Sequence, residues 1–231
     1  MIKKLFVLLF LMLSVVGYSQ MDKRKNAVSF SKGIECKYKD DVQGAIQHFE
    51  NALKAMPDDA ASMFELSEQY VKAGRVDAAF EMIKDAVSID LDNKWYQMRL
   101  ARFYRNFEEY DDFIKVYERL TKRYPEDVDM LSELIEVYLI AGKFDEALDK
   151  LTLLEKEIGE HPLIGEQRVE IYKRQGKTKN VIAELQKMIE ADPDNTRYYN
   201  MLAKYYMDNG KEKDAITLYE QIKVIDPNDH P

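Results

Sequence analysis

The stretch that decides the fold is residues 60–93, AASMFELSEQYVKAGRVDAAFEMIKDAVSIDLDN. Its apolar residues recur three and four positions apart in two runs, the first being Met63, Leu66, Tyr70 and Val71, the second Ala79, Ile83, Ala86 and Val87. This spacing places apolar side chains on one face of a helix. Between the runs lies KAGR, where Gly74 suits the left-handed turn that ends a helix. The stretch therefore predicts two amphipathic helices joined by a short turn.

The same pattern recurs every 34 residues along the chain. A tyrosine series runs Tyr70, Tyr104, Tyr138, Tyr172 and Tyr206, with Cys36 in the preceding place. Three apolar series keep the same step: Ala45, Ala79, Phe113, Ala147, Val181, Ala215; Phe49, Ile83, Tyr117, Leu151, Leu185, Tyr219; and Ala52, Ala86, Leu120, Leu154, Met188, Ile222. Turn glycines are Gly74, Gly142, Gly176 and Gly210, with Asp40 and Glu108 in the first and third repeats. A fixed period of this length indicates a repeat array whose series residues, Cys36 included, form the core.

The register continues without insertion from Asn26 to Asp229. The predicted repeats are residues 26–59, 60–93, 94–127, 128–161, 162–195 and 196–229, after a stub at 20–25 and before a tail at 230–231. Between repeats stand PDD at 57–59, PED at 125–127 and PDN at 193–195. Proline disfavours helix in the residue before it, and the Asp or Asn that follows suits the start of a new helix. The fourth repeat differs, with Gly159 in the proline position and Pro162 three residues later.

A 34-residue helical hairpin with small, aromatic, alanine and terminal proline positions at these spacings resembles the tetratricopeptide repeat. The resemblance covers residues 26–229. It implies an all-α fold, a right-handed superhelical solenoid of six helix-turn-helix repeats, and a function in binding other proteins. A solenoid of this kind presents an extended concave surface to a partner.

The amino-terminal residues have the layout of a secretory signal peptide. Lys3 and Lys4 precede an apolar run from Leu5 to Val16, and small or polar residues follow at Gly17 and Ser19. The apolar run is shorter than the roughly 20 residues that a membrane-spanning helix needs. We expect cleavage between Ser19 and Gln20. The ending in Ser-Gln resembles signal peptides of the Bacteroidota, so the sequence predicts an exported protein in the periplasm or at the outer membrane.

Composition weighs against several other functions. The formal net charge is −8, and an acidic chain is a poor partner for nucleic acid, whose binding depends on neutralising phosphates. The same charge weighs against an anionic membrane surface. His48, His161 and His230 lie far apart, and no metal-ligand spacing or phosphate-binding glycine loop occurs. We therefore expect no catalytic residues, no metal and no cofactor.

In the resembled family the first helix of each repeat lines the concave face. The outward positions of the first three repeats combine apolar and basic residues, and the predicted partner-binding set is Phe30, Ile34, Phe64, Trp95, Met98, Arg102 and Arg105. We hypothesise that the apolar strip holds apolar side chains of a partner segment while the arginines take an acidic group. The alternative is that Arg102 and Arg105 pair with neighbouring acids such as Glu68 and Glu136. In the fourth and fifth repeats the outward positions are Asp129, Ser132, Glu136, Leu139, Leu163, Glu166, Glu170 and Lys173.

The last repeat raises a separate expectation. Terminal repeats of a solenoid need a polar cap, and Tyr219, Ile222 and Ile225 lie near the end of the sequence. We expect their apolar faces to be covered by further chain, by a partner, or by self-association through this end. The predicted function is a protein–protein interaction scaffold of an envelope complex. The alternative is the ligand- or partner-sensing part of a longer membrane signalling receptor.

Overall fold

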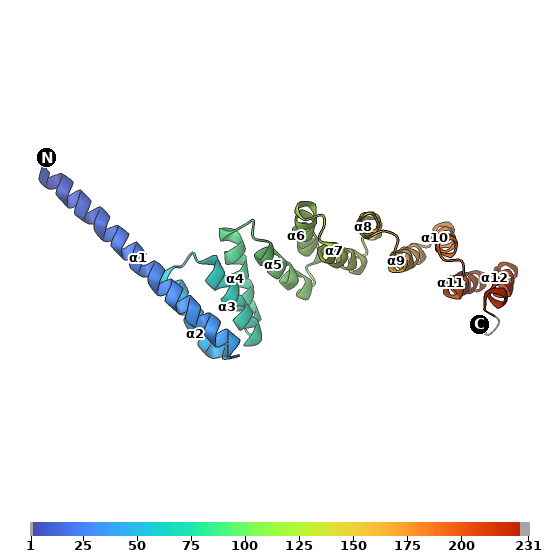
Figure 1. The fold of residues 1–231 in the computed structure, drawn as a ribbon, viewed down its shortest axis with the longest axis horizontal. Coiled ribbons are helices and arrows are strands. Elements are labelled where there is room, and N and C mark those ends of the chain that lie inside the picture. Colours follow the sequence, from blue (N-terminus) through green and yellow to red (C-terminus); the bar gives the residue numbers. More distant parts are fainter. Residues whose placement is uncertain (1, 227–231) are drawn as a thin grey trace. The chain divides into compact units, whose positions relative to one another are not determined.

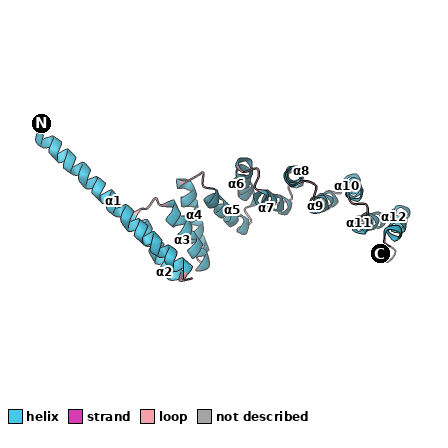
Figure 2. Ribbon diagram, in the orientation of Figure 1, coloured by secondary structure: helices cyan, strands magenta, loops and turns pink. Residues whose placement is uncertain are grey.

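The computed structural model describes the backbone of residues 2–226 and the side chains of residues 20–226. In this described part the chain forms twelve helices and no strand (Figures 1 and 2). It divides into two compact units, Met1–Val116 and Tyr117–Pro231. Pro227, Asp229 and His230 of the predicted last repeat and tail lie outside the described residues.

The first unit contains α1 (Ile2–Tyr38), α2 (Val42–Ala55), α3 (Ala60–Lys72), α4 (Val76–Ile89) and α5 (Lys94–Asn106). Each of these helices packs against the next along the chain. Helix α1 runs without a break through residues 20–25, which we expected to be a stub before the first repeat. Helix α6 (Tyr110–Arg123) contains the boundary between the units.

The second unit contains α7 (Val128–Ile140), α8 (Phe144–Ile158), α9 (Pro162–Arg174), α10 (Thr178–Ala191), α11 (Thr196–Asp208) and α12 (Glu212–Ile225). From α7 to α12 each helix packs against its neighbour in sequence. Helices α3, α5, α7, α9 and α11 have 13 residues each and begin at 34-residue steps. The prediction of an all-helical chain of helix-turn-helix repeats is confirmed.

One backbone motif closes each of the hairpins in the described part. The amide of Arg75 donates to the carbonyl of Tyr70 at 2.8 Å, and the residue before it, Gly74, has a φ of +74°. The same bond joins Asp41 to Cys36, Glu109 to Tyr104, Lys143 to Tyr138, Lys177 to Tyr172 and Lys211 to Tyr206. This is the glycine-type helix ending expected from KAGR. Asp40 and Glu108 adopt the same left-handed conformation without being glycine, with φ of +56° and +61°.

The residues that start the next helix also agree with the sequence. Asn93, Asp127 and Asn195 each accept a hydrogen bond from a backbone amide of the following first turn. Such caps satisfy amides that have no partner inside the helix. Where the fourth repeat lacks proline, Gly159 ends α8 with φ of +82° and ψ of −176°, a conformation essentially restricted to glycine. His161 then caps α9 through Nδ1.

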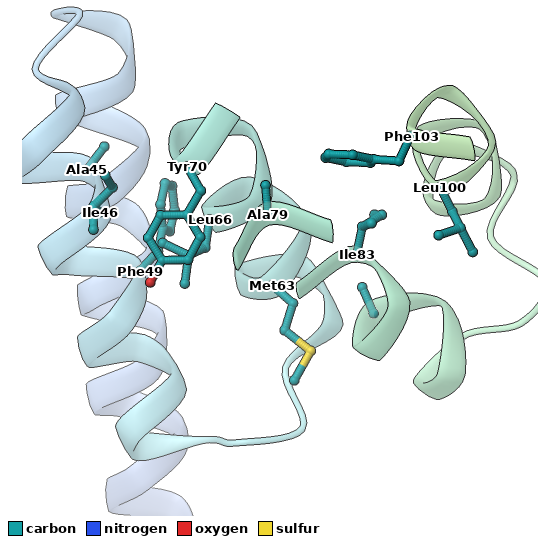
Figure 3. Close-up of a cluster of buried hydrophobic side chains, with 11 residues drawn as sticks. Ala45, Ile46, Phe49, Met63, Leu66, Tyr70, Ala79, Ile83, Leu100 and Phe103 are labelled. Atoms are coloured by element: carbon teal, nitrogen blue, oxygen red, sulfur yellow. The ribbon is translucent and has the colours of Figure 1, made fainter. Parts of the chain in front are cut away.

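The repeat series form the core. All six residues of the series that starts at Ala45 are completely buried, and so are Phe49, Ile83, Tyr117, Leu151 and Leu185. Figure 3 shows the cluster of the first unit, to which α2, α3, α4 and α5 each contribute side chains. Burying one aromatic side chain contributes about 4–6 kcal/mol before conformational entropy is subtracted. Apolar packing between hairpins therefore stabilises the fold.

The tyrosine series is buried only in part. Tyr70 and Tyr138 are buried, whereas Tyr104, Tyr172 and Tyr206 are half-buried at the edges of the core, as is Cys36. The expectation that these residues belong to the core is thus confirmed fully at Tyr70 and Tyr138. Close helix approach adds a constraint that we did not predict. A β-carbon on Gly33 of α1 would lie 2.6 Å from the ring of Phe49 on α2.

Candidate functional site

The predicted strip divides into packed and exposed residues. Phe30 packs its ring 5.7 Å from that of Phe49, measured between centroids, and Ile34 lies against the same core cluster. Phe64 stacks on Tyr96 with ring centroids 5.1 Å apart. All three side chains are partly buried. They therefore stabilise the first unit and offer only part of their surface to a partner.

Trp95 is the most exposed of the predicted apolar residues. It lies in the first turn of α5, 64% exposed, and the ammonium of Lys94 lies 5.5 Å from its ring centroid. Met98 is half-buried and Arg102 is exposed on the same helix, while Arg105 is half-buried. The structure therefore places Trp95 and Arg102 where a partner can reach them.

Ion pairs link the first helices of the three repeats in this unit. Lys37 of α1 binds Glu65 at 2.6 Å and Glu68 at 2.7 Å, and Arg99 of α5 pairs with Glu68. Burial lowers the pKa of Arg99, and the charge of Arg102 lowers it further. Glu68, one of the two acids named as alternative partners for Arg102 and Arg105, is thus bound by Lys37 and Arg99.

The second unit has a groove between α7 and α9. One pocket, of about 190 Å³, is lined by Val128, Ser132, Ile135, Leu154, Ile158, His161, Leu163, Ile164 and Gln167. A second, of about 210 Å³, is lined by Glu136, Leu139, Ile140, Gln167, Glu170, Ile171 and Arg174. Gln167 lines both pockets, so they adjoin along one face. Below, this surface is called the α7–α9 groove.

The α7–α9 groove is mainly apolar, with polar groups at defined points. Leu163 is 59% exposed, and Ile140 and Ile158 are also exposed. The charged side chains lie in the second pocket, where Arg174 donates to Glu170 at 3.0 Å across one turn of helix. The Gln167 side chain has an amide donor and an acceptor, the two groups that a peptide backbone needs. An apolar lining with few placed polar groups is typical of a binding site.

Five of the outward positions predicted for the fourth and fifth repeats line this groove, namely Ser132, Glu136, Leu139, Leu163 and Glu170. Gln167 and the isoleucines of α7 and α9 were missed. The periodicity could have indicated them, because Gln167 lies four residues after Leu163 on the same helix face. The aromatic residues of the amino-terminal repeats, Phe30, Phe64 and Trp95, give the more prominent signal in the sequence.

No chemical centre accompanies these surfaces in the described residues. Within residues 20–226 no group of three His, Cys, Asp or Glu side chains is placed to hold a metal ion. Over the described part of the chain, no helix combines the length and the apolar character needed to cross a membrane.

Within each unit, regular 34-residue hairpins pack on one another through apolar side chains, and in the second unit an apolar groove lies between first helices. These features define a helical-repeat protein with a surface suited to binding. Family models described as Tetratricopeptide repeat match residues 39–99 and 173–231, more than half of the chain, and residues 94–137. The chain belongs to the tetratricopeptide repeat family.

Individual relatives are distant. The chain is 25% identical over 175 residues to the cellulose synthase operon protein C of Pseudomonas fluorescens, an alignment that covers 72% of this chain and 14% of that protein. The chain thus spans a small part of the length of this relative.

Solved structures share the fold. A tetratricopeptide repeat protein from Parabacteroides merdae has a TM-score of 0.61 and 16% identity, with 90% of this chain and 81% of that chain covered. YrrB, described as a tetratricopeptide repeat protein with an unusual peptide-binding site, has a TM-score of 0.53 and 12% identity, with 90% of each chain covered.

Proposed function

We propose that this chain is a non-enzymatic scaffold of the cell envelope that holds an extended segment of a partner protein in the α7–α9 groove. The observation that carries the proposal is the pair of adjoining pockets that share Gln167, with an exposed apolar side chain, Leu163, at their edge. Membership of a family whose proteins typically mediate protein–protein interactions supports it.

The chemistry of the groove favours an extended, largely apolar segment. Aliphatic side chains of the partner would cover Leu163, Ile140 and Ile158, removing from water apolar surface that contributes about 25 cal/mol per Å². The side-chain amide of Gln167 would donate to the backbone carbonyl, and accept from the backbone N–H, of one residue of the extended segment. Helical-repeat proteins use surfaces of this kind because side chains on a rigid array need little ordering when a partner binds.

Site-specific photo-crosslinking tests the location. A benzophenone amino acid is placed at residue 163 in the groove, at residue 95 in the predicted amino-terminal strip, or at residue 186, which is exposed on α10. We expect a defined partner adduct from position 163 and none from position 186. An adduct from position 95 alone would assign binding to the amino-terminal strip, and the absence of any adduct at position 163 would reject the groove.

Point variants provide the second test. Leu163→Glu places a charge on the exposed edge of the groove and should remove the adduct formed from a probe at residue 139, with the helical fold intact. Gln186→Glu adds the same negative charge at an exposed position outside the groove and should leave the adduct unchanged. Trp95→Ala with Arg102→Ala should also leave it unchanged, whereas loss of binding in that variant supports the amino-terminal strip.

Export is part of the proposal. Lys3, Lys4 and the apolar run from Leu5 to Val16 support a signal peptide, and removal of residues 1–19 would leave Gln20 at the amino terminus. Mass spectrometry of the protein purified from envelope fractions should find that terminus. Recovery from the cytoplasmic fraction with residues 1–19 still attached would contradict export.

A further inference from the structure

A buried arginine interrupts a leucine series of the core. Leu66, Leu100, Leu134 and Leu202 are buried at 34-residue steps, and the fifth repeat has Arg168 in the same place. The Arg168 side chain is only 9% exposed. A charge in a core position loses its hydration, so it must be held by partners.

Acidic residues at two other core-type positions hold this arginine. Its guanidinium donates to Glu155 of α8 at 2.7 Å and to Thr152 at 3.3 Å, and lies 3.6 Å from Glu184 of α10. The place of Glu155 is taken by Val87 in the second repeat, and that of Glu184 by Val116 in the third. Glu155 of the fourth repeat and Arg168 and Glu184 of the fifth thus form a charged group of three at places that are apolar in several other repeats. Apolar residues in these places are often as stabilising or more so, so stability alone does not account for the charges.

A pocket of about 240 Å³ opens beside this group. It is lined by Glu155, Glu160, His161, Pro162, Gly165, Glu184, Lys187, Met188, Ala191, Asp192 and Tyr198, from helices α8 to α11 and their connections. The walls combine an apolar surface, formed by Met188, Ala191 and Tyr198, with carboxylates. Only His161 also lines the α7–α9 groove, so among the described residues the two surfaces are otherwise separate.

The pocket keeps an excess of negative charge. Four carboxylates line it, while the cations that contact them are Arg168 and Lys187. Hydrogen bonding from Arg168 lowers the pKa of Glu155, so this carboxylate is ionised at neutral pH. Lys187 is about half exposed, with its ammonium 3.0 Å from Glu155 and 3.4 Å from Glu160. An exposed lysine of this kind is held weakly and can move away.

We propose that this α8–α11 pocket binds an alkylammonium group, with the apolar wall taking the alkyl chain and the carboxylates Glu155, Glu160 and Glu184 taking the ammonium in competition with Lys187. The shared chemistry is that of a lysine side chain in a partner protein and of a free diamine. An aliphatic chain with an ammonium group at its end matches a pocket with one apolar wall and one anionic wall.

Isothermal titration calorimetry of the full chain tests the pocket with two probes, acetyl-Gly-Lys-Gly-amide and 1,5-diaminopentane. The same peptide with an acetylated lysine, which lacks the charge, should not bind. Tighter binding of the peptide identifies a protein partner as the source, and tighter binding of the diamine identifies a free amine. Failure of both probes to bind at concentrations of about 10 mM overturns the proposal.

Two variants should change affinity in opposite directions. Glu184→Gln removes an anionic wall residue and should weaken binding about tenfold, while Lys187→Gln removes the internal competitor and should tighten it about threefold. Lys179→Gln is the matched control, because it makes the same charge change at an exposed position of α10 outside the pocket. Equal effects of Lys187→Gln and Lys179→Gln would show that only the net charge attracts the probes, and no effect of Glu184→Gln in a folded variant would exclude this pocket as the binding site.

Glu160→Gln covers the case in which Glu184→Gln disturbs folding, because Glu160 is 69% exposed and forms an ion pair with Lys187. It should weaken binding with the melting temperature unchanged, and unchanged affinity in this folded variant counts against the pocket. Leu163→Glu should leave amine binding unaltered, because Leu163 lies in the α7–α9 groove and outside this pocket. The experiment therefore distinguishes a failure of the groove proposal from a failure of the pocket proposal.

Discussion

The phenol of Tyr138 donates a 2.5 Å hydrogen bond to Oε1 of Glu118, twenty residues earlier in the chain. Tyr70 makes the same bond to Oε1 of Glu50, at 2.8 Å and over the same separation. In each case a tyrosine on the first helix of a repeat reaches the second helix of the repeat before it. Tyr70 and Tyr138 thus join neighbouring hairpins through a polar contact as well as through burial.

Removing this hydroxyl should destabilise the second unit. Tyr138→Phe keeps the buried ring and loses the bond to a carboxylate, so the free energy of unfolding should fall by about 1–2 kcal/mol. Urea unfolding followed by circular dichroism measures the change. Tyr172→Phe is the matched control, because the ring at that position is only half-buried, and we expect a smaller change there. If the free energy of unfolding fell equally in the two variants, the hydrogen bond to Glu118 would not be the cause of the destabilisation.

The same tyrosine should make stability depend on alkaline pH. Burial, with the neighbouring Glu118, raises the pKa of Tyr138 well above its ordinary value. Tyrosine in the unfolded chain ionises near pH 10. Above that pH the unfolded state therefore binds fewer protons than the folded state, and the free energy of unfolding falls as pH rises.

Urea unfolding at pH 8, 10 and 11 checks this slope. The stabilisation should be fully present below about pH 10 and decline above it, and the decline should be shallower in Tyr138→Phe. Tyr70, whose pKa is also raised chiefly by burial, should keep part of the effect in that variant. A decline of the same steepness in the variant would exclude Tyr138 as a source.

Glycine should stabilise the hairpin turn of the third repeat. Glu108 has a φ of +61°, a conformation that costs a residue with a side chain about 1–2 kcal/mol. Part of that gain is lost to the greater freedom of glycine in the unfolded chain, so Glu108→Gly should raise the free energy of unfolding by about 0.5–1 kcal/mol. Gly142→Ala, at the same place in the fourth repeat, should lower it by a similar amount. Thermal unfolding measures both changes. If both substitutions raised the melting temperature, or both lowered it, the prediction would be contradicted.

A buried amide should be replaceable with a gain in stability. Gln69 on α3 is completely buried, and neither Nε2 nor Oε1 of its amide has a hydrogen-bond partner in the described residues. The same place in later repeats holds the buried apolar residues Phe103, Val137 and Ile171. Gln69→Leu should therefore raise the free energy of unfolding by about 1–2 kcal/mol.

Gln97→Leu is the matched control for this change. The Gln97 amide is also buried, but it donates to the carbonyl of Leu91, so the same substitution there should be destabilising. The two glutamines should thus respond with opposite signs in urea unfolding. A loss of stability in Gln69→Leu would show that its amide makes a bond important to the fold.

Close approach of helices gives a fifth prediction. A methyl group at Gly33 would overlap the ring of Phe49, so Gly33→Ala should cost about 1–3 kcal/mol in the first unit. Phe49→Leu removes the ring atoms that a methyl group at residue 33 would overlap. Gly33→Ala should therefore lower the free energy of unfolding less in the Phe49→Leu background than in the unmodified chain. If the two substitutions have additive effects in a double-mutant cycle, overlap with the Phe49 ring is not the cause of the destabilisation by Gly33→Ala.

The contact pattern explains which parts of the site could be predicted. The exposed Trp95 and Arg102 followed from helix periodicity, since every fourth residue returns to the same face. Phe30 and Phe64 follow the same periodicity but lie partly inside the core, because aromatic side chains are long enough to reach the neighbouring ring. Packing between repeats decides which outward side chains a neighbouring helix covers. The pattern within one repeat does not contain that information.

The sequence by itself determined the helices, the hairpin turns and the buried series, because a period of 34 residues repeats the same local rules of helix spacing, turn glycine and helix cap. Only the tertiary structure decided that Gln167 lies between two pockets, that Arg99 and Lys37 share Glu68, and that Arg168 lies in a leucine position held by Glu155. These relations join residues of different helices whose distances depend on how the hairpins pack. The physical reason is that backbone conformation is set mainly by near neighbours, whereas grooves and ion pairs depend on side chains from separate repeats.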